Sequence, residues 1–129
     1  MIYLDTSAAL KLVRPEAETP ALEAWINDRA GFARVSSRLL RVEMVRAVAR
    51  NAPDRLARAH EILSGIVLLS MDDAAPPAEV IGDAHLRGLD AIHLASAPAV
   101  RSALTAFVAY DKRLLTAATA LGLPVEAPA

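Results

Sequence analysis

The sequence has no cysteine and almost no net charge, and both shortages exclude classes of protein. Without cysteine the chain forms no disulfide, no thiolate zinc site and no cysteine nucleophile, which suits the cytoplasm, where we expect the protein. The formal net charge is −1, so no overall field favours nucleic acid or an anionic membrane. Any contact with a polyanion must therefore come from a local group of basic residues.

Long apolar runs are also missing. No stretch approaches the roughly 20 residues of a membrane helix, and the first residues lack a basic segment followed by a long apolar one, so we expect neither a membrane contact nor a signal peptide. Hydrophobic residues nevertheless make up 54% of the 129 residues, and aromatic residues only 4%. We expect one domain over residues 1–129, with a core of Leu, Val, Ile and Ala.

Short apolar runs alternate with longer amphipathic segments along the chain. Strands are predicted over residues 2–5, 32–35, 66–71 and 105–110, with a short strand or a tail at Val125. Helices are predicted over residues 8–13, 21–29, 37–50, 54–63, 78–87, from 91 onward and over 112–121, with a loop over 72–77. Such alternation favours an α/β fold, with a parallel sheet between two layers of helices.

Two acids directly follow predicted strands. Asp5 comes after the first strand and Asp111 after the fourth. Ligands of parallel sheets bind beyond the carboxyl ends of the strands, so both acids are candidates for a functional site. Each would equally serve as the N-cap of the helix that follows it, although Thr6 or Ser7 could also cap the first helix.

Two further acids lie among apolar residues. Glu43 is on the predicted helix of SSRLLRVEMVRAVAR, beside an apolar stripe, where a charge must be paired or metal-bound; an ion pair with Arg46 is the simpler interpretation. Asp90, in LRGLDAIHLASA, follows Gly88, which is expected to end one helix, and Asp90 would cap the next.

If folding gathers these four acids, their mutual repulsion requires a cation. Oxygen ligands without thiolates select a hard ion, Mg²⁺ or Mn²⁺. Such an ion lowers the pKa of a bound water, so that it attacks a phosphodiester, and stabilises charge on the phosphoryl oxygen. The residues thus point to metal-dependent phosphodiester hydrolysis.

The stretches MIYLDTSA, SSRLLRVEMVRA, LDAIHLASA and VAYDKRL, in this order and spacing, resemble a PIN domain. More narrowly, they resemble the VapC toxins of toxin–antitoxin pairs. The resemblance implies a PIN-like three-layer α/β/α fold with a five-stranded, mainly parallel sheet, and an endoribonuclease dependent on Mg²⁺ or Mn²⁺. It also implies a type II toxin that forms a homodimer, a VapB-type antitoxin, and tRNA or another structured RNA as substrate.

The resemblance also assigns the site residues. Asp5 and Asp90 correspond to the firmest metal ligands, Glu43 to a ligand that binds directly or through water, and Asp111 to an acid that holds a second metal or a bridging water. Ser7, with Thr6 as a second supporting polar residue, would orient ligands or water. Two departures stand out: Ala109 takes the place of a hydroxyl residue that often precedes the last acid, and Pro98 should kink or stop the helix after Asp90.

The basic residues gather in the middle of the chain, where residues 34–58 hold seven arginines. Arg46, one turn from Glu43, is the best candidate for a contact with substrate phosphate. Three others are expected to share helix faces with it or with each other, namely Arg38, Arg41 and Arg50. The alternative is a solvated helix face.

Several other residues have two interpretations. His93 would contact Asp90 or substrate, or simply be packed or paired, which is commoner. Tyr3 and Trp25 would stack on a base, or Trp25 would anchor its helix. Apolar residues of the early helices would form a contact surface for an antitoxin or a second subunit: Leu10, Val13, Leu22 and Trp25.

Two other functions fit the same fold class. A receiver-like signalling domain also holds Mg²⁺ with an acid cluster, but it needs an early acid pair, where this chain has Asp5 alone, and its lysine does not directly follow the last acid as Lys112 follows Asp111. A PIN-like interaction module without catalysis is the other alternative, and the presence of all four acids argues against it.

Overall fold

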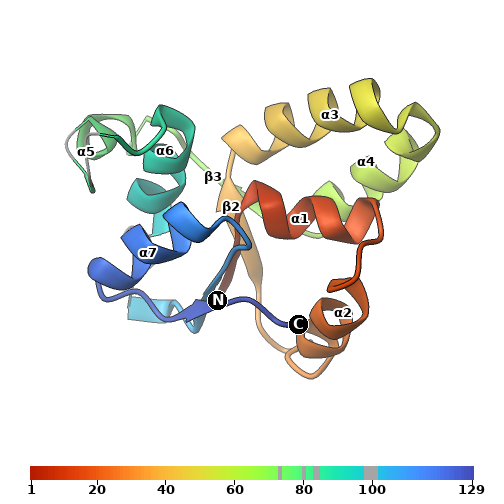
Figure 1. Cartoon of the computed structure of the whole chain (residues 1–129), viewed down its shortest axis with the longest axis horizontal. Helices are drawn as coiled ribbons and strands as arrows, with labels where there is room; N and C mark the ends of the chain where they lie inside the picture. Colours follow the sequence, from red (N-terminus) through yellow and green to blue (C-terminus); the bar gives the residue numbers. More distant parts are fainter. Residues whose placement is uncertain (73, 80, 83–84, 98–101) are drawn as a thin grey trace.

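The computed structural model describes residues 1–72, 74–79, 81–82, 85–97 and 102–129, and its centre is a parallel sheet (Figure 1). The strands are β1 (Ile2–Leu4), β2 (Arg34–Ser37), β3 (Val67–Leu69), β4 (Ala106–Val108) and β5 (Val125–Glu126). They lie in the order β3-β2-β1-β4-β5, and every pairing is parallel. The predicted five-stranded parallel sheet is therefore confirmed.

Helices cover both faces of this sheet. They are α1 (Thr6–Val13), α2 (Thr19–Asn27), α3 (Leu39–Asn51), α4 (Leu56–Ser64), α5 (Ala75–Ala78), α6 (Gly88–Ser96) and α7 (Lys112–Ala120), with a short 3-10 turn η1 (Pro53–Arg55) before α4. Figure 1 shows α1, α3 and α4 on one side of the sheet and α5, α6 and α7 on the other. No helix of the described residues has the length and apolarity that a membrane crossing requires.

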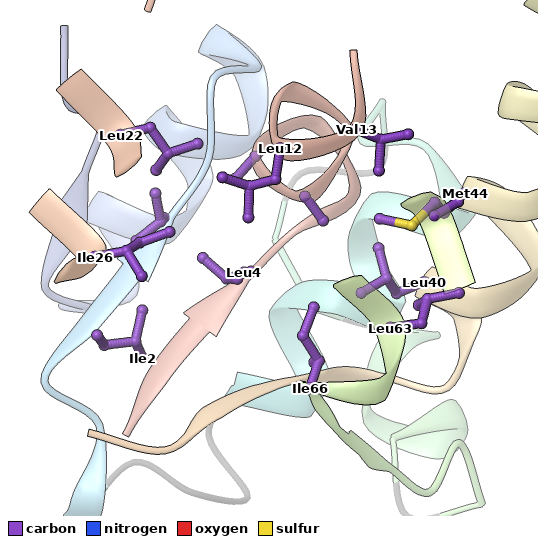
Figure 2. Packing of buried hydrophobic residues seen from close by; sticks show 14 of the residues in the cluster. Ile2, Leu4, Leu12, Val13, Leu22, Ile26, Leu40, Met44, Leu63 and Ile66 are labelled. Carbon is purple, nitrogen blue, oxygen red and sulfur yellow. The ribbon is translucent and has the colours of Figure 1, made fainter. Parts of the chain in front are cut away.

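The three residues of β1 divide the core between the two faces. Ile2 and Leu4 pack against α1 to α4 in one apolar cluster (Figure 2), whereas Tyr3 packs with Phe107 and with side chains of α6 and α7 in the other. All three β1 side chains are fully buried, as expected of a central strand with helices on both faces. The packing on both faces therefore fixes the carboxyl end of β1 and Asp5, which follows it, in a rigid position.

The strand order places a topological switch beside that end. The chain runs outward from β1 through β2 to β3 and then returns to lay β4 on the other side of β1. In open parallel sheets the ligand site lies at this point, beyond the carboxyl ends of the strands. The N–H of Asp5 donates to the carbonyl of Val108 at 3.1 Å, so the residues that follow β1 and β4 start from adjacent positions.

The helix predicted over residues 78–87 is wrong for the described part of that range, because residues 79, 81–82 and 85–87 are not helical, while residues 80, 83 and 84 lie outside the described residues. A short helix, α5, lies earlier and covers residues 75–77 of the predicted loop 72–77, because proline is tolerated in the first turn of a helix. Gly82 has a φ of 71°, a left-handed backbone conformation that a right-handed helix cannot include. Gly88, expected to close the preceding helix, is instead the first residue of α6. Helix α6 ends at Ser96, and Pro98 lies outside the described residues.

Smaller shifts affect β2 and α1. β2 begins at Arg34, two residues later than predicted, and it includes Ser36 and Ser37, although the strand was predicted to end at residue 35 and a helix to begin at residue 37. The strand buries Ser36 because its hydroxyl donates to the carbonyl of Leu4 at 2.6 Å. The N-cap of α1 is Asp5 rather than Thr6 or Ser7.

Candidate active site

Asp5 is buried at the carboxyl end of β1, with 3% of its surface exposed. Its Oδ1 accepts a hydrogen bond from the N–H of Ala8 at 2.8 Å, which caps α1. The hydroxyl of Ser7 donates to both carboxylate oxygens, at 2.8 and 2.9 Å. These contacts fix the carboxylate in one orientation at the switch between β1 and β4.

The environment of Asp5 opposes its negative charge. Burial raises the pKa of the Asp5 carboxyl to about 6, against the hydrogen bonds of Ala8 and Ser7 and the nearby His93, which lower the pKa. The folded chain therefore holds a carboxylate whose ionised form is incompletely compensated. A cation bound beside Asp5 would remove that cost.

Ser7 also connects α1 to β4. Its oxygen accepts a hydrogen bond from the N–H of Tyr110 at 2.8 Å. The side chain thus satisfies a backbone donor after β4 while its own proton goes to Asp5. Ser7 was predicted to support the first acid, and the structure places it in direct contact with Asp5.

Glu43 reaches the same edge of the sheet from α3. Its Oε1 accepts a hydrogen bond from the hydroxyl of Thr6 at 2.8 Å and lies 2.9 Å from Nε2 of His93. Partial burial acts to raise the pKa of Glu43, but the hydrogen bonds of His93 and Thr6 outweigh it and hold this pKa below its ordinary value. The proposed ion pair with Arg46 is wrong, because the side chain that pairs with Glu43 is the imidazole of His93.

His93 is a buried, paired histidine of α6, with 1% of its surface exposed. Its Nδ1 lies 2.8 Å from the hydroxyl of Tyr3, and its Nε2 also lies 3.1 Å from that of Thr6. The preference for a paired histidine is confirmed, but sequence reasoning missed both partners, since Tyr3 was considered for base stacking. That expectation is wrong: Tyr3 is fully buried and stacks on Phe107 at 5.1 Å.

Asp90 lies in the first turn of α6 and is not its N-cap, which is Arg87. Partial burial raises the pKa of Asp90, and the charges of Asp111 and Glu43 act in the same direction, while His93 and Arg87 oppose them. The three carboxylates are thus close enough to influence one another. The Asp90 carboxylate accepts no hydrogen bond from any described residue, which leaves its oxygens available.

Asp111 follows β4 and caps α7, because its Oδ1 accepts from the N–H of Leu114 at 2.9 Å. The capping interpretation is therefore correct for Asp5 and Asp111 and wrong for Asp90. Ala109, where a hydroxyl was expected, is fully buried, and its N–H donates to Glu126. Asp111 is steadied by the start of α7, and its side chain remains exposed.

The donor set fits a hard divalent cation. Within the described part of the chain, no three acidic or imidazole side chains converge into a ready-made metal cage. Mg²⁺ does not need one, since it keeps several waters and binds through one or two carboxylates. Burial opposes the charges of Asp5 and Asp90, and Oε2 of Glu43 makes no hydrogen bond to a described residue, so each of these three acids has an oxygen or a charge that a cation would satisfy.

The four candidate arginines lie on or next to α3 and are exposed: Arg38, Arg41, Arg46 and Arg50. None of them forms an ion pair with another described residue. Their charges are therefore available to an external anion. Arg46 lies three residues, just under one helical turn, beyond Glu43.

The proposed apolar contact surface of the early helices is largely wrong. Val13 and Leu22 are fully buried in the core, while Leu10 and Trp25 are partly buried against it. Trp25 anchors α2, and the guanidinium of Arg29 covers its ring at 4.1 Å. Exposed large apolar side chains among the described residues lie elsewhere, at Phe32, Val42, Val67 and Leu89.

Comparison with known proteins agrees with this architecture. A family model for the PIN domain matches residues 2–120. Ribonuclease VapC47 of Mycobacterium tuberculosis (strain CDC 1551 / Oshkosh) is 43% identical over 99% of this chain and 97% of its own length, and Ribonuclease VapC35 of the same strain is 42% identical over the same shares. The crystal structure of Mycobacterium tuberculosis VapC20, a sarcin–ricin loop cleaving toxin, covers 99% of this chain and all of its own with a TM-score of 0.70 at 15% identity, a likeness of fold. The chain therefore belongs to the PIN-domain family and, within it, to the VapC group.

Proposed function

We propose that this protein is a metal-dependent endoribonuclease and the toxic component of a type II toxin–antitoxin system. The observation that carries the proposal is that the charges of Glu43 and Asp111 act on Asp90 at the start of α6, while Asp5 lies buried where β1 ends, beside β4. The raised pKa values of Asp5 and Asp90 support it, because they reflect negative charge that the protein does not compensate. Full-length relatives named as ribonucleases give the reaction class.

Asp5 and Asp90 would be the firmest ligands of Mg²⁺ or Mn²⁺, with Glu43 directly or through water and Asp111 at a second ion or a bridging water. When bound, such an ion lowers the pKa of water and stabilises charge on a phosphoryl oxygen. Ser7 and Thr6 do not need to touch substrate. They orient the carboxylates of Asp5 and Glu43 through the hydrogen bonds described above.

The exposed arginines supply the contact with RNA. Arg46 lies about one turn beyond Glu43 on α3 and would hold a phosphate beside the reacting one. Its neighbours on the helix and at its start, Arg38, Arg41 and Arg50, would extend the contact along the strand. Phosphate contacts position the RNA without reading its sequence, so the proposed substrate is a structured RNA such as tRNA, selected by shape.

The partners follow from membership of the VapC group. We propose a VapB-type antitoxin that blocks the site, a homodimer as the oligomeric state, a single PIN domain over residues 1–129, and the cytoplasm as the place of action. Coexpression with the product of an adjacent short reading frame, followed by size-exclusion chromatography, tests the first two. A protein that elutes alone and as a monomer would contradict them.

The decisive test of the activity compares the purified protein with its Asp5→Asn variant. The proposal predicts that the protein cleaves RNA with Mg²⁺ or Mn²⁺ and stops with EDTA, and that the variant, folded by circular dichroism, neither cleaves RNA nor arrests growth. Sequencing of RNA ends after brief induction would identify the substrate. A folded wild-type protein without cleavage under any of these conditions would favour the alternative, a catalytically silent interaction module.

A further inference from the structure

A chain of hydrogen bonds runs from the sheet to Glu43. The N–H of Ser37 donates to the hydroxyl oxygen of Tyr3 at 3.0 Å. The same hydroxyl lies 2.8 Å from Nδ1 of His93, and Nε2 of His93 lies 2.9 Å from Oε1 of Glu43. Ser37, Tyr3 and His93 are all buried, so water does not compete along the chain.

The direction of these bonds follows from counting protons. Ser37 has already donated to the Tyr3 oxygen, and the hydroxyl has one proton of its own to give. The nearby Ser36 and Ser96 each donate to a backbone carbonyl, at 2.6 and 2.8 Å, so neither supplies a proton to Tyr3. Among the side-chain atoms of the described residues, Nδ1 of His93 is the one in hydrogen-bonding geometry with the Tyr3 hydroxyl, at 2.8 Å, so we take it as the acceptor of the Tyr3 proton.

This direction fixes the tautomer of the imidazole. A neutral imidazole whose Nδ1 accepts must carry its proton on Nε2. That Nε2–H points at Oε1 of Glu43, the same oxygen to which Thr6 donates. Two donors on one oxygen set the rotation of the carboxylate and leave Oε2 for an external ligand.

The aromatic packing keeps the donor in place. The ring of Tyr3 stacks on Phe107 with an interplanar angle of 10° and meets the edge of His93 at 83°. Tyr3 is also in the central strand of the sheet. The hydroxyl therefore has little freedom to turn away from Nδ1.

We propose that Tyr3 and His93 are positioning residues. Tyr3 holds His93 as its Nε2–H tautomer, and His93 in turn orients Glu43 so that its free oxygen can bind the divalent cation of the site. The inference rests on the proposed function in so far as it gives Glu43 a metal to bind. The tautomer itself is a property of the folded chain alone. Neither Tyr3 nor His93 needs to touch RNA.

The first test reads the tautomer directly in the wild-type protein. The ¹⁵N chemical shifts of a labelled imidazole distinguish a protonated ring nitrogen from a bare one. We expect His93 to show a protonated Nε2 and an unprotonated Nδ1 in metal-free protein at mildly alkaline pH. A protonated Nδ1, alone or together with Nε2, would overturn the proposal, whether or not the protein cleaves RNA.

The second test compares two matched removals of a tyrosine hydroxyl. Tyr3→Phe removes the donor to Nδ1, whereas Tyr110→Phe removes a hydroxyl that donates to the carbonyl of Pro128, away from Glu43. Mn²⁺ affinity is measured by the electron paramagnetic resonance signal of the free ion. Tyr3→Phe should weaken Mn²⁺ binding about 10- to 100-fold, the usual effect of losing an outer-shell partner, and Tyr110→Phe should leave it unchanged. Equal affinities in all three proteins would contradict the proposal.

A third comparison separates positioning from packing. His93→Gln keeps an N–H donor for Glu43 and an acceptor for Tyr3, whereas His93→Leu keeps only bulk. We expect His93→Gln to bind Mn²⁺ within a few fold of the wild type and His93→Leu to lose most of its affinity, at similar folded fractions. Equal losses in the two variants would assign His93 a packing role only. If the tautomer and Mn²⁺ results hold but RNA is not cleaved, the proposed function fails and the positioning role stands.

Discussion

The hydroxyl of Ser7 bridges both carboxylate oxygens of Asp5, at 2.8 and 2.9 Å. The same oxygen accepts the N–H of Tyr110, so Ser7→Ala removes the orienting donor of Asp5 and leaves a backbone N–H unsatisfied. We predict a loss of about 1–3 kcal/mol in the free energy of unfolding, the usual cost of an orphaned buried donor, and a fall in cleavage greater than the loss of folded protein.

Urea denaturation and the initial rate of RNA cleavage check this prediction. Ser64→Ala is the matched control, because that hydroxyl donates to the carbonyl of Glu61 on an exposed part of α4. The control should change neither quantity. A Ser7→Ala protein as stable and active as the control would mean that Asp5 needs no such tether.

Asp5→Asn should stabilise the metal-free protein while it abolishes cleavage. The folded pKa of Asp5 is about 6 against an ordinary value of 3.8, so the native state binds the extra proton between these values. Stability therefore falls as the pH rises from about 4 to about 6 and stays reduced above that range. The asparagine avoids this loss, which amounts to about 3 kcal/mol for a shift of roughly two pKa units.

The measurement is the difference in unfolding free energy between Asp5→Asn and wild type at several pH values, without divalent ions. The difference should be small near pH 4 and should favour the variant by about 1–3 kcal/mol at about pH 7.5. A variant less stable than wild type at neutral pH would show that the Asp5 charge is already compensated.

Divalent ions should stabilise the wild type by mass action. A ligand of the folded state at about 100 times its dissociation constant adds about 2.7 kcal/mol. We predict that Mg²⁺ or Mn²⁺ raises the melting temperature of the wild type, and that Asp90→Asn reduces this rise because it removes a carboxylate with no other partner. Calorimetry measures the melting temperatures of both proteins with and without the added ion. An equal rise in both proteins would remove Asp90 from the metal site.

Arg46→Ala should weaken RNA binding uniformly across sequences. The loss of one phosphate contact lowers the slope of log affinity against log salt by about 1. Arg14→Ala is the control, since that exposed arginine caps the C-terminal end of α1, whereas Asp5 and the candidate site lie at its N-terminal end. Fluorescence anisotropy at several salt concentrations, with a catalytically dead background, gives the slopes. Identical slopes in the two variants would place the RNA elsewhere.

The acids at the strand ends were the most predictable part of the site. Asp5 and Asp111 follow buried strands, and a parallel sheet brings such positions to one edge whatever the details of the helices. The alternation of apolar runs also sufficed for the sheet and for most helices. Local pattern and global topology agree in these elements.

The partners of the acids were less predictable. The link between Tyr3 and His93 spans 90 residues of sequence, and that between His93 and Glu43 spans 50. Neither spacing carries a local signal, and Arg46, one turn from Glu43, was the obvious neighbour on a helix. Only the packing of α6 against β2 and α3 selects the histidine instead.

The start of α6 was mispredicted for a related reason. Gly88 resembles a helix terminator, and the segment before it has a helical composition, but the backbone of Gly82 adopts a left-handed conformation that composition does not reveal. Asp90 consequently lies inside the first turn of α6 rather than at its cap. Its carboxylate makes no capping bond and is left for another partner.

The central claim is that the carboxylates at the topological switch between β1 and β4 hold a divalent ion. Diffraction from a crystal grown with Mn²⁺ tests this claim most directly. An anomalous difference map should show a peak in contact with Asp5 and Asp90, and the peak should be absent from crystals of Asp5→Asn grown in the same way. A wild-type map without a peak at these residues, from crystals of a protein that cleaves RNA, would contradict the account.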